Sequence, residues 1–402
     1  MAVGGTTAKP AGRSPGTGGA VTSPAVSIII LNHDKAAYTR ACLQSLLQVG
    51  AGEKFEVIAV DNGSRDETPE LLESLKPDFA RAGSEIKIVT NAENVGAIIG
   101  RNQAMEIAGG DDFLFMDNDV VAGDDGWLAA LRSRLDADAS IGIIGPKLLF
   151  PWEPHLIEFA GCAVSPSGRI QYMGRGATRD DPAFNTEREV QCLISACILF
   201  RRGLVEEIGN LDEAFSPVQY EDLDFCYRTR RAGHRVVYTH KVEMYHFEHT
   251  TTGGSPDINF RYVTIKNGKL FKKRWRHMFE TESGPPDEEC AWAAIEKKSI
   301  KEIDEREWKT KNGGYTMANG DELRQNLKQM IVERLFLKVD PVAMTDDAPL
   351  MATYGIDSVA LFELVVGLEE DFGITLEDEE FSLDLFENVN SVAALVERKQ
   401  GA

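Results

Sequence analysis

Long apolar segments are absent from this sequence of 402 residues. The densest apolar run, Cys192 to Phe200, has the length of a buried strand and falls well short of the roughly 20 residues that a membrane-spanning helix needs. Residues 1–25 are rich in Gly, Ala, Pro and Thr and contain no apolar core of the kind found in signal peptides. We therefore expect no transmembrane segment and a cytoplasmic protein.

Cysteine is also scarce, with six residues and no pair at the C-x-x-C spacing. This pattern argues against a disulfide framework or a zinc ribbon, and it favours buried reduced thiols. Basic residues are outnumbered, with 43 Lys and Arg against 64 Asp and Glu, for a net charge of −21. Nucleic-acid binding needs clustered basic residues, so we expect no nucleic-acid partner.

The negative charge is concentrated at the C-terminus. Residues 321–402 contain 18 acidic and 6 basic residues, a net charge of −12 in one fifth of the chain. We therefore divide the chain into a disordered leader (1–25), a main domain (26–280), a linker that contains a helix (281–320) and an acidic module (321–402). The basic stretch from Lys266 to His277 reads as a solvated helix, with a carrier-docking face or a membrane-surface patch as alternatives.

The main domain shows the alternation of strands and helices that is typical of an α/β fold. Apolar runs at 26–31, 55–60, 86–89 and 113–116 alternate with helical stretches such as 38–49 and 66–75. This spacing predicts a parallel sheet that is covered on both faces. Ligands bind at the carboxyl ends of the strands in such sheets, and polar residues follow several of these runs.

One polar motif is typical of a metal site. MDNDV places Asp117 and Asp119 directly after a strand, although two carboxylates in a turn also occur in solvent-exposed loops. The sequence contains no P-loop and no G-x-G-x-x-G motif to hold phosphates. A divalent cation bound by these carboxylates would therefore have to neutralise a diphosphate.

Residues 26–280 resemble the inverting glycosyltransferases of family 2, in particular the rhamnosyltransferase-like branch. The resemblance rests on VSIIILNHDKAAYTRACLQSLL, VDNGSRDET, MDNDV and the block SACILFRRGLVEEIGNLDEAFSPVQYEDLDFCYR, which occur in the family's order. It implies a GT-A type fold, a nucleotide-diphosphate sugar as donor, and attack by an acceptor hydroxyl with inversion.

By position, the resemblance assigns a nucleotide-binding role to five residues. It gives Asp61 the contact with the base and places His33 where the family often stacks an aromatic ring. Asn-His replaces the more usual Thr-Tyr or Pro-Tyr at positions 32 and 33, so the choice of base stays open. Arg101 and Asn94 (in NVGAIIGRN) lie near the same edge, and Asp117 points toward the ribose or the sugar.

The resemblance also assigns the metal and the chemistry. Asp119 and His246 match ligands of Mg²⁺ or Mn²⁺, and Asp222 matches the general base. A carboxylate beside like charges has a raised pKa, which suits a base that works near neutral pH.

The acidic module resembles acyl and peptidyl carrier proteins. YGIDSVALFELV is similar to their Asp-Ser-Leu motif, and helices are expected at 323–337, from Ser358, and at 390–399, with a turn around 383–387. The resemblance implies a small four-helix domain with 4′-phosphopantetheine on Ser358, attached by a phosphopantetheinyl transferase and loaded by a partner enzyme. A phosphodiester at a helix N-terminus is electrostatically favourable.

Together these features predict a metal-dependent glycosyltransferase whose acyl or aminoacyl acceptor is tethered to its carrier domain. A second hypothesis keeps the transferase but gives it a free or lipid acceptor, with the carrier domain as a docking module. A third treats the chain as a scaffold without turnover. The complete set of Asp61, Asp117, Asp119, Asp222 and His246 argues against the scaffold.

Overall fold

The structure, a computed structural model, describes residues 24–248, 258–303, 320–335, 339–354 and 383–400, and also Leu337, Leu364, Leu368, Phe372 and Ile374. These residues form two separate hydrophobic cores, one in an α/β domain and one in a C-terminal helical domain. The predicted leader up to residue 23 lies outside the described residues, as do residues 304–319 of the predicted linker.

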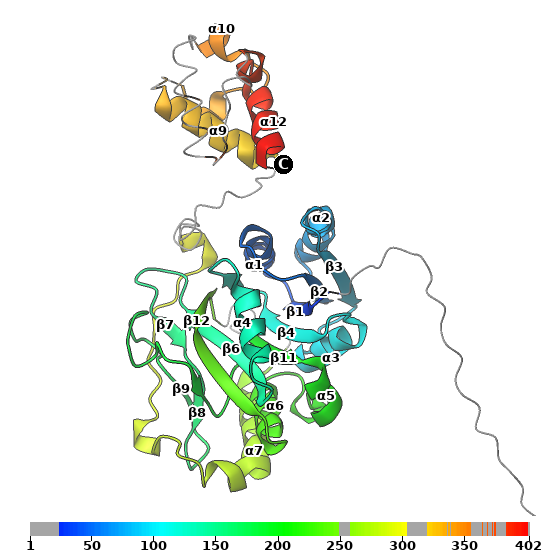
Figure 1. Cartoon of the computed structure of the whole chain (residues 1–402), viewed down its shortest axis with the longest axis vertical. Helices are drawn as coiled ribbons and strands as arrows, with labels where there is room; N and C mark the ends of the chain where they lie inside the picture. The colour runs from blue at the N-terminus through cyan, green and yellow to red at the C-terminus, as the bar shows by residue number, and fades with distance from the viewer. Residues whose placement is uncertain are drawn as a thin grey trace, which may run out of the picture.

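A ten-stranded sheet forms the centre of the α/β domain (Figure 1). Its strands are β1 (Val26–Asn32), β2 (Phe55–Asn62), β3 (Glu85–Asn91), β4 (Asp112–Asp117), β5 (Val120–Ala122), β6 (Ile141–Leu149), β7 (Ile157–Phe159), β10 (Arg188–Glu189), β11 (Cys197–Arg201) and β12 (Arg235–His246). The main order is β10-β12-β6-β11-β4-β1-β2-β3, with β5 paired to β12 and β7 paired to β6. A separate pair consists of β8 (Cys162–Val164) and β9 (Ile170–Tyr172).

The predicted parallel pairing is confirmed for the first part of the sheet. Strand β1 runs parallel to β2 and β4, and β2 runs parallel to β3. Every residue of β2 is buried, as expected for a strand that is covered on both faces. Strand β11 differs, because it is antiparallel to both β4 and β6. The chain reaches β11 through irregular segments rather than through a crossover helix, and only a crossover would impose parallel pairing.

Helices flank this sheet (Figure 1). They are α1 (Ala36–Gln48), α2 (Thr68–Arg81), α3 (Ala97–Ile107), α4 (Trp127–Asp136), α5 (Arg202–Ile208), α6 (Glu221–Arg231) and α7 (Phe260–Phe279). The predicted helices at 38–49 and 66–75 correspond to α1 and to a longer α2. The basic stretch from Lys266 to His277 belongs to α7, whose Phe271, Trp275 and Phe279 are fully buried.

The predicted linker helix is not present in the described part of the linker. Between residues 281 and 303 the chain forms two single 3-10 turns, η3 (Asp287–Glu289) and η4 (Ile300–Glu302), joined by extended chain. Side-chain contacts fix this segment on the α/β domain: Asp287 accepts hydrogen bonds from Ser165 and Ser167, and Ile303 is buried in the main core. Within residues 281–303 the chain therefore packs on the domain without forming a helix, and the rest of the predicted linker lies outside the described residues.

The C-terminal domain is helical in all its described elements. These are α9 (Gly320–Arg334), η5 (Pro341–Ala343), α10 (Leu350–Tyr354), η7 (Leu383–Phe386) and α12 (Val389–Gln400). Leu364, Leu368 and Phe372 are helical and buried at a spacing of four, in the region where a helix is expected after Ser358. Ser358 itself lies outside the described residues.

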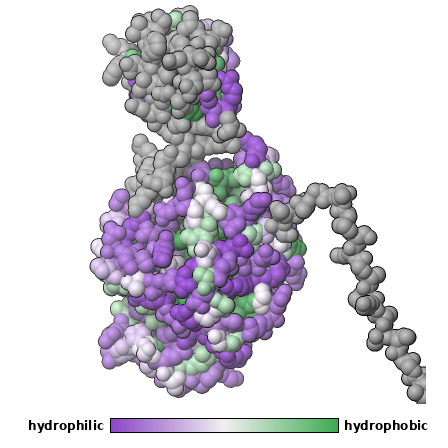
Figure 2. Space-filling model, viewed as in Figure 1, coloured by the Kyte–Doolittle hydropathy of each residue, from purple (hydrophilic) through white to green (hydrophobic). Residues whose placement is uncertain are grey.

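Two sequence-based expectations about the whole chain can be compared with the structure. All six cysteines are free thiols, and five of them are buried. None of the described helices combines the length and the apolar composition that crossing a bilayer would need. In the face shown in Figure 2, hydrophilic residues cover most of the described surface of the α/β domain.

Candidate active site

A cavity of about 390 Å³ opens at the carboxyl ends of β1, β2 and β4. Its lining includes the predicted residues His33, Asn94, Arg101, Asp117, Asp119, Asp222 and His246. The structure therefore brings residues from separate parts of the chain to one place, at the sheet edge where α/β proteins bind ligands. Asp61, the remaining predicted residue of this domain, is not among the lining residues.

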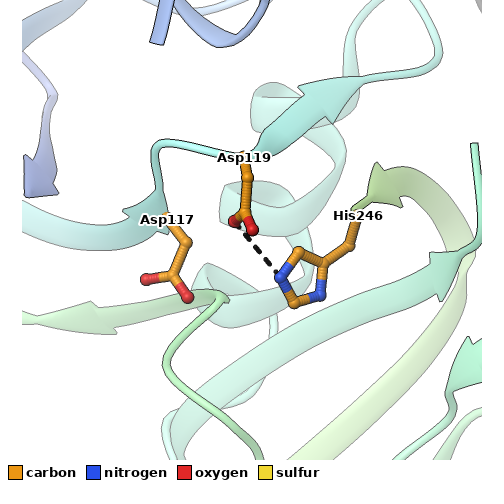
Figure 3. A group of neighbouring side chains, drawn as sticks. All are labelled: Asp117, Asp119 and His246. Carbon is orange, nitrogen blue, oxygen red and sulfur yellow. Dashed lines mark ion pairs between the residues drawn. The ribbon is translucent and has the colours of Figure 1, made fainter. Parts of the chain in front are cut away.

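Asp117, Asp119 and His246 form the metal-type group of the cavity (Figure 3). Each offers one ligand atom, and these atoms lie within 4.8 Å of one another. Antiparallel pairing of β5 and β12 sets His246 opposite Val120, and the backbone N–H of Phe247 donates to the carbonyl of Asp119. As a result the His246 Nε2 atom lies 3.3 Å from the Asp119 Oδ1 atom. Carboxylate oxygens and an imidazole nitrogen form a donor set that suits Mn²⁺ or Mg²⁺.

Glu158, on β7, contacts the side of the His246 ring that faces away from Asp119. This residue was not predicted from the sequence. Its Oε2 atom lies 3.4 Å from the other imidazole nitrogen of His246, Nδ1. Burial alone would lower the pKa of His246, but Asp119 and Glu158 outweigh it and raise that pKa well above its usual value. Burial raises the pKa of the Glu158 carboxyl. A carboxylate that holds the second nitrogen of a histidine is typical of metal sites, because it orients the ring.

Arg101, on α3, connects the metal-type group with the other half of the cavity. Its guanidinium donates to Asp117 Oδ1 at 2.6 Å and to Ser195 Oγ at 2.8 Å, and it lies 3.5 Å from Glu221 Oε1. The side chain is 4% exposed. The structure thus uses this cation to hold Asp117 and the start of α6 in place, in addition to lining the cavity.

Asp222 lies in the first turn of α6, where helix N–H groups and the positive end of the helix dipole face a carboxylate. Its Oδ1 atom accepts from the N–H of Leu223 at 2.8 Å, and its Oδ2 atom accepts from the N–H of Ser195 at 3.3 Å. Burial raises the pKa of Asp222 despite these bonds. Asp222 is partly buried and the adjacent Glu221 is fully buried, and the pKa of Glu221 is raised to about 8 by burial and then by Asp222.

Three of the predicted nucleotide-binding residues, His33, Asp61 and Asn94, hydrogen-bond with the backbone or side chains at the ends of β1 and β2 and in the loops that follow. His33 Nδ1 lies 3.0 Å from the carbonyl oxygen of Asn62. Asn94 Oδ1 accepts from Asn62 Nδ2 and from the N–H of Gly96, both at 2.9 Å. Asp61 is 3% exposed, and its Oδ1 atom accepts from the N–H of Ser64. Its contact with a base stays a prediction.

Gly63 explains why the turn after β2 has this sequence. Its φ is +77°, and an added Cβ would lie 2.8 Å from the backbone of Glu93. Only glycine fits this position without strain. The turn aligns the loop that carries Asn94 with the end of β2.

Comparison with known proteins agrees with this geometry. Residues 27–209 match the model of glycosyl transferase family 2, and residues 327–397 match that of the phosphopantetheine attachment site. The chain joins a family 2 glycosyltransferase domain to an acyl carrier domain. The predicted family, the GT-A type fold and a phosphopantetheine-binding domain are thereby confirmed. Ser358 falls within the second match.

The transferase domain resembles the N-acetylglucosaminyl-diphospho-decaprenol L-rhamnosyltransferase of Mycobacterium tuberculosis, with 25% identity over 52% of this chain and 72% of that protein. The carrier domain is 32% identical to the acyl carrier protein of Thermotoga maritima, over 21% of this chain and all of that protein. In fold, the chain resembles GalNAc-T7, solved with UDP, GalNAc and Mn²⁺, with a TM-score of 0.51 and 15% identity over 65% of this chain and 50% of that one.

Other curated relatives are much longer than this chain. It spans 28% of a protein from Sinorhizobium fredii that is 26% identical to it, and 17% of the O-antigen biosynthesis protein RfbC of Myxococcus xanthus, which is 32% identical.

Proposed function

We propose that the transferase domain moves a sugar, with inversion, from a nucleotide-diphosphate donor to a hydroxyl or amine of an acceptor. One observation carries this proposal: the same cavity is lined by Asp117, Asp119 and His246 and also by Asp222. A divalent cation held by Asp119 and His246 would offset the negative charge that develops on the leaving diphosphate.

Asp222 is the general base in this proposal. Its partly buried carboxylate takes the proton from the acceptor hydroxyl as that oxygen attacks the anomeric carbon. The raised pKa brings the carboxylate closer to the operating pH, which makes proton transfer more favourable. The N–H groups of Ser195 and Leu223 hold the carboxylate in position without occupying both lone pairs of each oxygen. Attack from the side of Asp222 inverts the anomeric centre in a single displacement.

The test is donor hydrolysis and sugar transfer by purified full-length chain, assayed with uridine and thymidine diphosphate sugars in the presence of Mn²⁺ or Mg²⁺. Asp222→Asn should reduce turnover at least 100-fold, because removing a positioned base commonly costs about 10²–10⁴. Asp180→Asn, at an exposed position away from the cavity, is the matched control. An Asp222→Asn variant that retains half of the activity would remove Asp222 from the chemistry.

For the acceptor, we propose an acyl or aminoacyl group tethered as a thioester to phosphopantetheine on Ser358. The match of residues 327–397 to the phosphopantetheine attachment family supports this proposal, because a phosphopantetheine arm can carry an acyl group as a thioester. The required partners are a phosphopantetheinyl transferase and an acyl-loading enzyme. Tethering raises the effective acceptor concentration to about millimolar when the linker is flexible.

Intact mass after co-production with a broad-specificity phosphopantetheinyl transferase tests this assignment. Wild type should gain one phosphopantetheine and Ser358→Ala none. The alanine variant should also lose transfer to the tethered acceptor while donor hydrolysis continues. Full transfer by Ser358→Ala would contradict tethering and support the alternative, in which the carrier domain only docks and the acceptor is free or lipid-linked.

A further inference from the structure

Part of the lining of the active-site cavity, which we call the apolar side, consists of aliphatic and aromatic side chains. It includes Ile170, Tyr172, Ile194, Leu223, Phe260 and Trp292. Five of these side chains come from the α/β domain itself. Trp292 comes from the extended segment 281–303, which leads toward the carrier domain. This tryptophan lines the cavity and is 54% exposed, so much of its ring is accessible to a ligand.

Arg175 fixes the segment around Trp292. Its guanidinium carbon lies 4.0 Å from the centre of the Trp292 ring, and its Nε donates to the carbonyl of Ala293 at 3.0 Å. The two terminal nitrogens of the same guanidinium donate to Glu248 at 3.0 and 2.9 Å, and Lys297 lies 3.0 Å from that carboxylate. Trp292 is thus held in a set position at the cavity, as a rigid aromatic anchor must be to bind a ligand at low entropic cost.

The apolar side is continuous with the catalytic groups. The Trp292 ring packs edge-to-face on Tyr172, with ring centroids 5.1 Å apart. Burial, followed by the charges of Glu158 and Asp222, raises the pKa of Tyr172 well above its usual value, so this tyrosine lies within electrostatic range of both carboxylates. Arg175 also approaches Glu158, the partner of His246, at 3.8 Å. A ligand on the tryptophan can therefore extend to Asp222.

We propose that the segment between the two domains forms a wall of the acceptor site, and that Trp292 and Tyr172 bind the acyl chain of an acceptor whose hydroxyl or amine points to Asp222. This inference rests on the proposed function and names the class of its acceptor. Six aliphatic or aromatic side chains contribute to this part of the lining, and Glu248, which also lines the cavity, is already paired with Arg175. A sugar ring stacked on the tryptophan would need polar partners around its hydroxyl groups, whereas an acyl chain needs apolar surface.

The test measures binding, so that it does not depend on turnover. 3-Hydroxyacyl-pantetheines with 4, 8 and 12 carbons serve as probes, titrated calorimetrically into the full-length chain. Burial of each CH₂ contributes about 0.8 kcal/mol, so affinity should rise up to about fourfold per carbon that reaches the apolar side. Trp292→Ala should weaken binding of the 12-carbon probe at least tenfold and flatten the dependence on chain length, whereas Trp292→Phe should retain most of both.

Tyr262→Ala is the matched control, because Tyr262 is 64% exposed on α7 and does not line the cavity. Affinity that is independent of chain length in wild type would overturn the inference. So would a Trp292→Ala variant that binds like Tyr262→Ala, or a methyl glycoside that binds tighter than the acyl probes. Donor hydrolysis by wild type separates the two proposals. If wild type hydrolyses the donor but its affinity for the acyl probes does not depend on their chain length, only the acyl site is refuted. If the affinity depends on chain length but the donor is neither hydrolysed nor used for transfer, only the transferase assignment is refuted.

Discussion

Buried Glu221, next to Asp222, should make the stability of the transferase domain fall as pH rises. The pKa of Glu221 is raised from an ordinary 4.5 to about 8, first by burial and then by Asp222. Arg101 acts in the opposite direction, but its guanidinium is 3.5 Å from Glu221 and 2.6 Å from Asp117. Arg101 therefore interacts more strongly with Asp117 than with Glu221. For this reason the pKa of Glu221 stays raised although an arginine lies beside it.

The sign and size of the effect follow from proton linkage. The folded chain keeps the Glu221 proton to a higher pH than the unfolded chain, so it binds more protons between these two pKa values, and stability decreases there with rising pH. The contribution of the Glu221 proton to the free energy of unfolding is fully present below about pH 4.5 and is lost as pH rises to about 8. The shift corresponds to about 5 kcal/mol in total, of which about half falls between pH 5 and 7. The two carboxyls titrate as a pair, so the effect belongs to both.

Glu221→Gln keeps the shape of the protonated side chain and removes its titration. Its stability advantage over wild type should therefore grow by about 2 kcal/mol between pH 5 and pH 7. Urea unfolding in the presence of a chelator, followed by tryptophan fluorescence, measures this difference. All five tryptophans precede residue 310, so the signal reports on the transferase domain and its linker rather than on the carrier domain.

Glu106→Gln, at an exposed position on α3, is the control and should show no such pH dependence. A Glu221→Gln variant that is less stable than wild type at pH 8, or whose advantage stays constant from pH 5 to pH 8, would refute the reasoning. The buried carboxyl would then be ionised at neutral pH and stabilised by Arg101.

Three further substitutions test other parts of the site. Glu158→Gln should weaken Mn²⁺ binding about 10–100-fold by calorimetry, because the carboxylate orients His246; unchanged affinity would exclude that role. Arg101→Met should lower the free energy of unfolding by about 2–3 kcal/mol in urea, because it breaks the ion pair with Asp117 and removes the donor to buried Ser195; a loss below about 1 kcal/mol would contradict this. Asp61→Asn should cost about 1 kcal/mol or less of stability but weaken nucleoside-diphosphate binding; equal binding would show that Asp61 only supports its turn.

Local pattern predicted the strands and helices of the first part of the chain because apolar runs of strand length alternate there with helical stretches. The four apolar runs correspond to β1–β4, and the polar residues at their ends include Asp117, which lines the cavity. The segment 281–303 could not be predicted in the same way. Its composition is that of a linker, and its structure depends on contacts with residues more than 100 positions away, such as Arg175 and Ser165.

Glu158 shows why part of the site could not be found in the sequence. The only local signal is one acidic residue inside the apolar run LIEF, which is equally typical of an edge strand with one exposed side. Its role depends on the pairing of β7 with β6 and of β6 with β12, which brings residue 158 next to residue 246. Pairing of distant strands carries no local pattern, so this contact appears only in the folded chain.

The charges around the cavity suggest why Glu221 is held protonated. Asp117, Asp119 and Asp222 already line a space that is proposed to receive a diphosphate, and Arg101 lies 3.5 Å from Glu221. A further ionised carboxylate at Glu221 would repel both the donor and Asp222, and it would drive the pKa of the proposed base further up. Burial keeps Glu221 neutral at pH 7 at the expense of stability at higher pH. The protein thus loses some stability at higher pH because Glu221 is buried, and the same burial lowers the negative charge beside the proposed base. A lower negative charge there favours binding of an anionic donor.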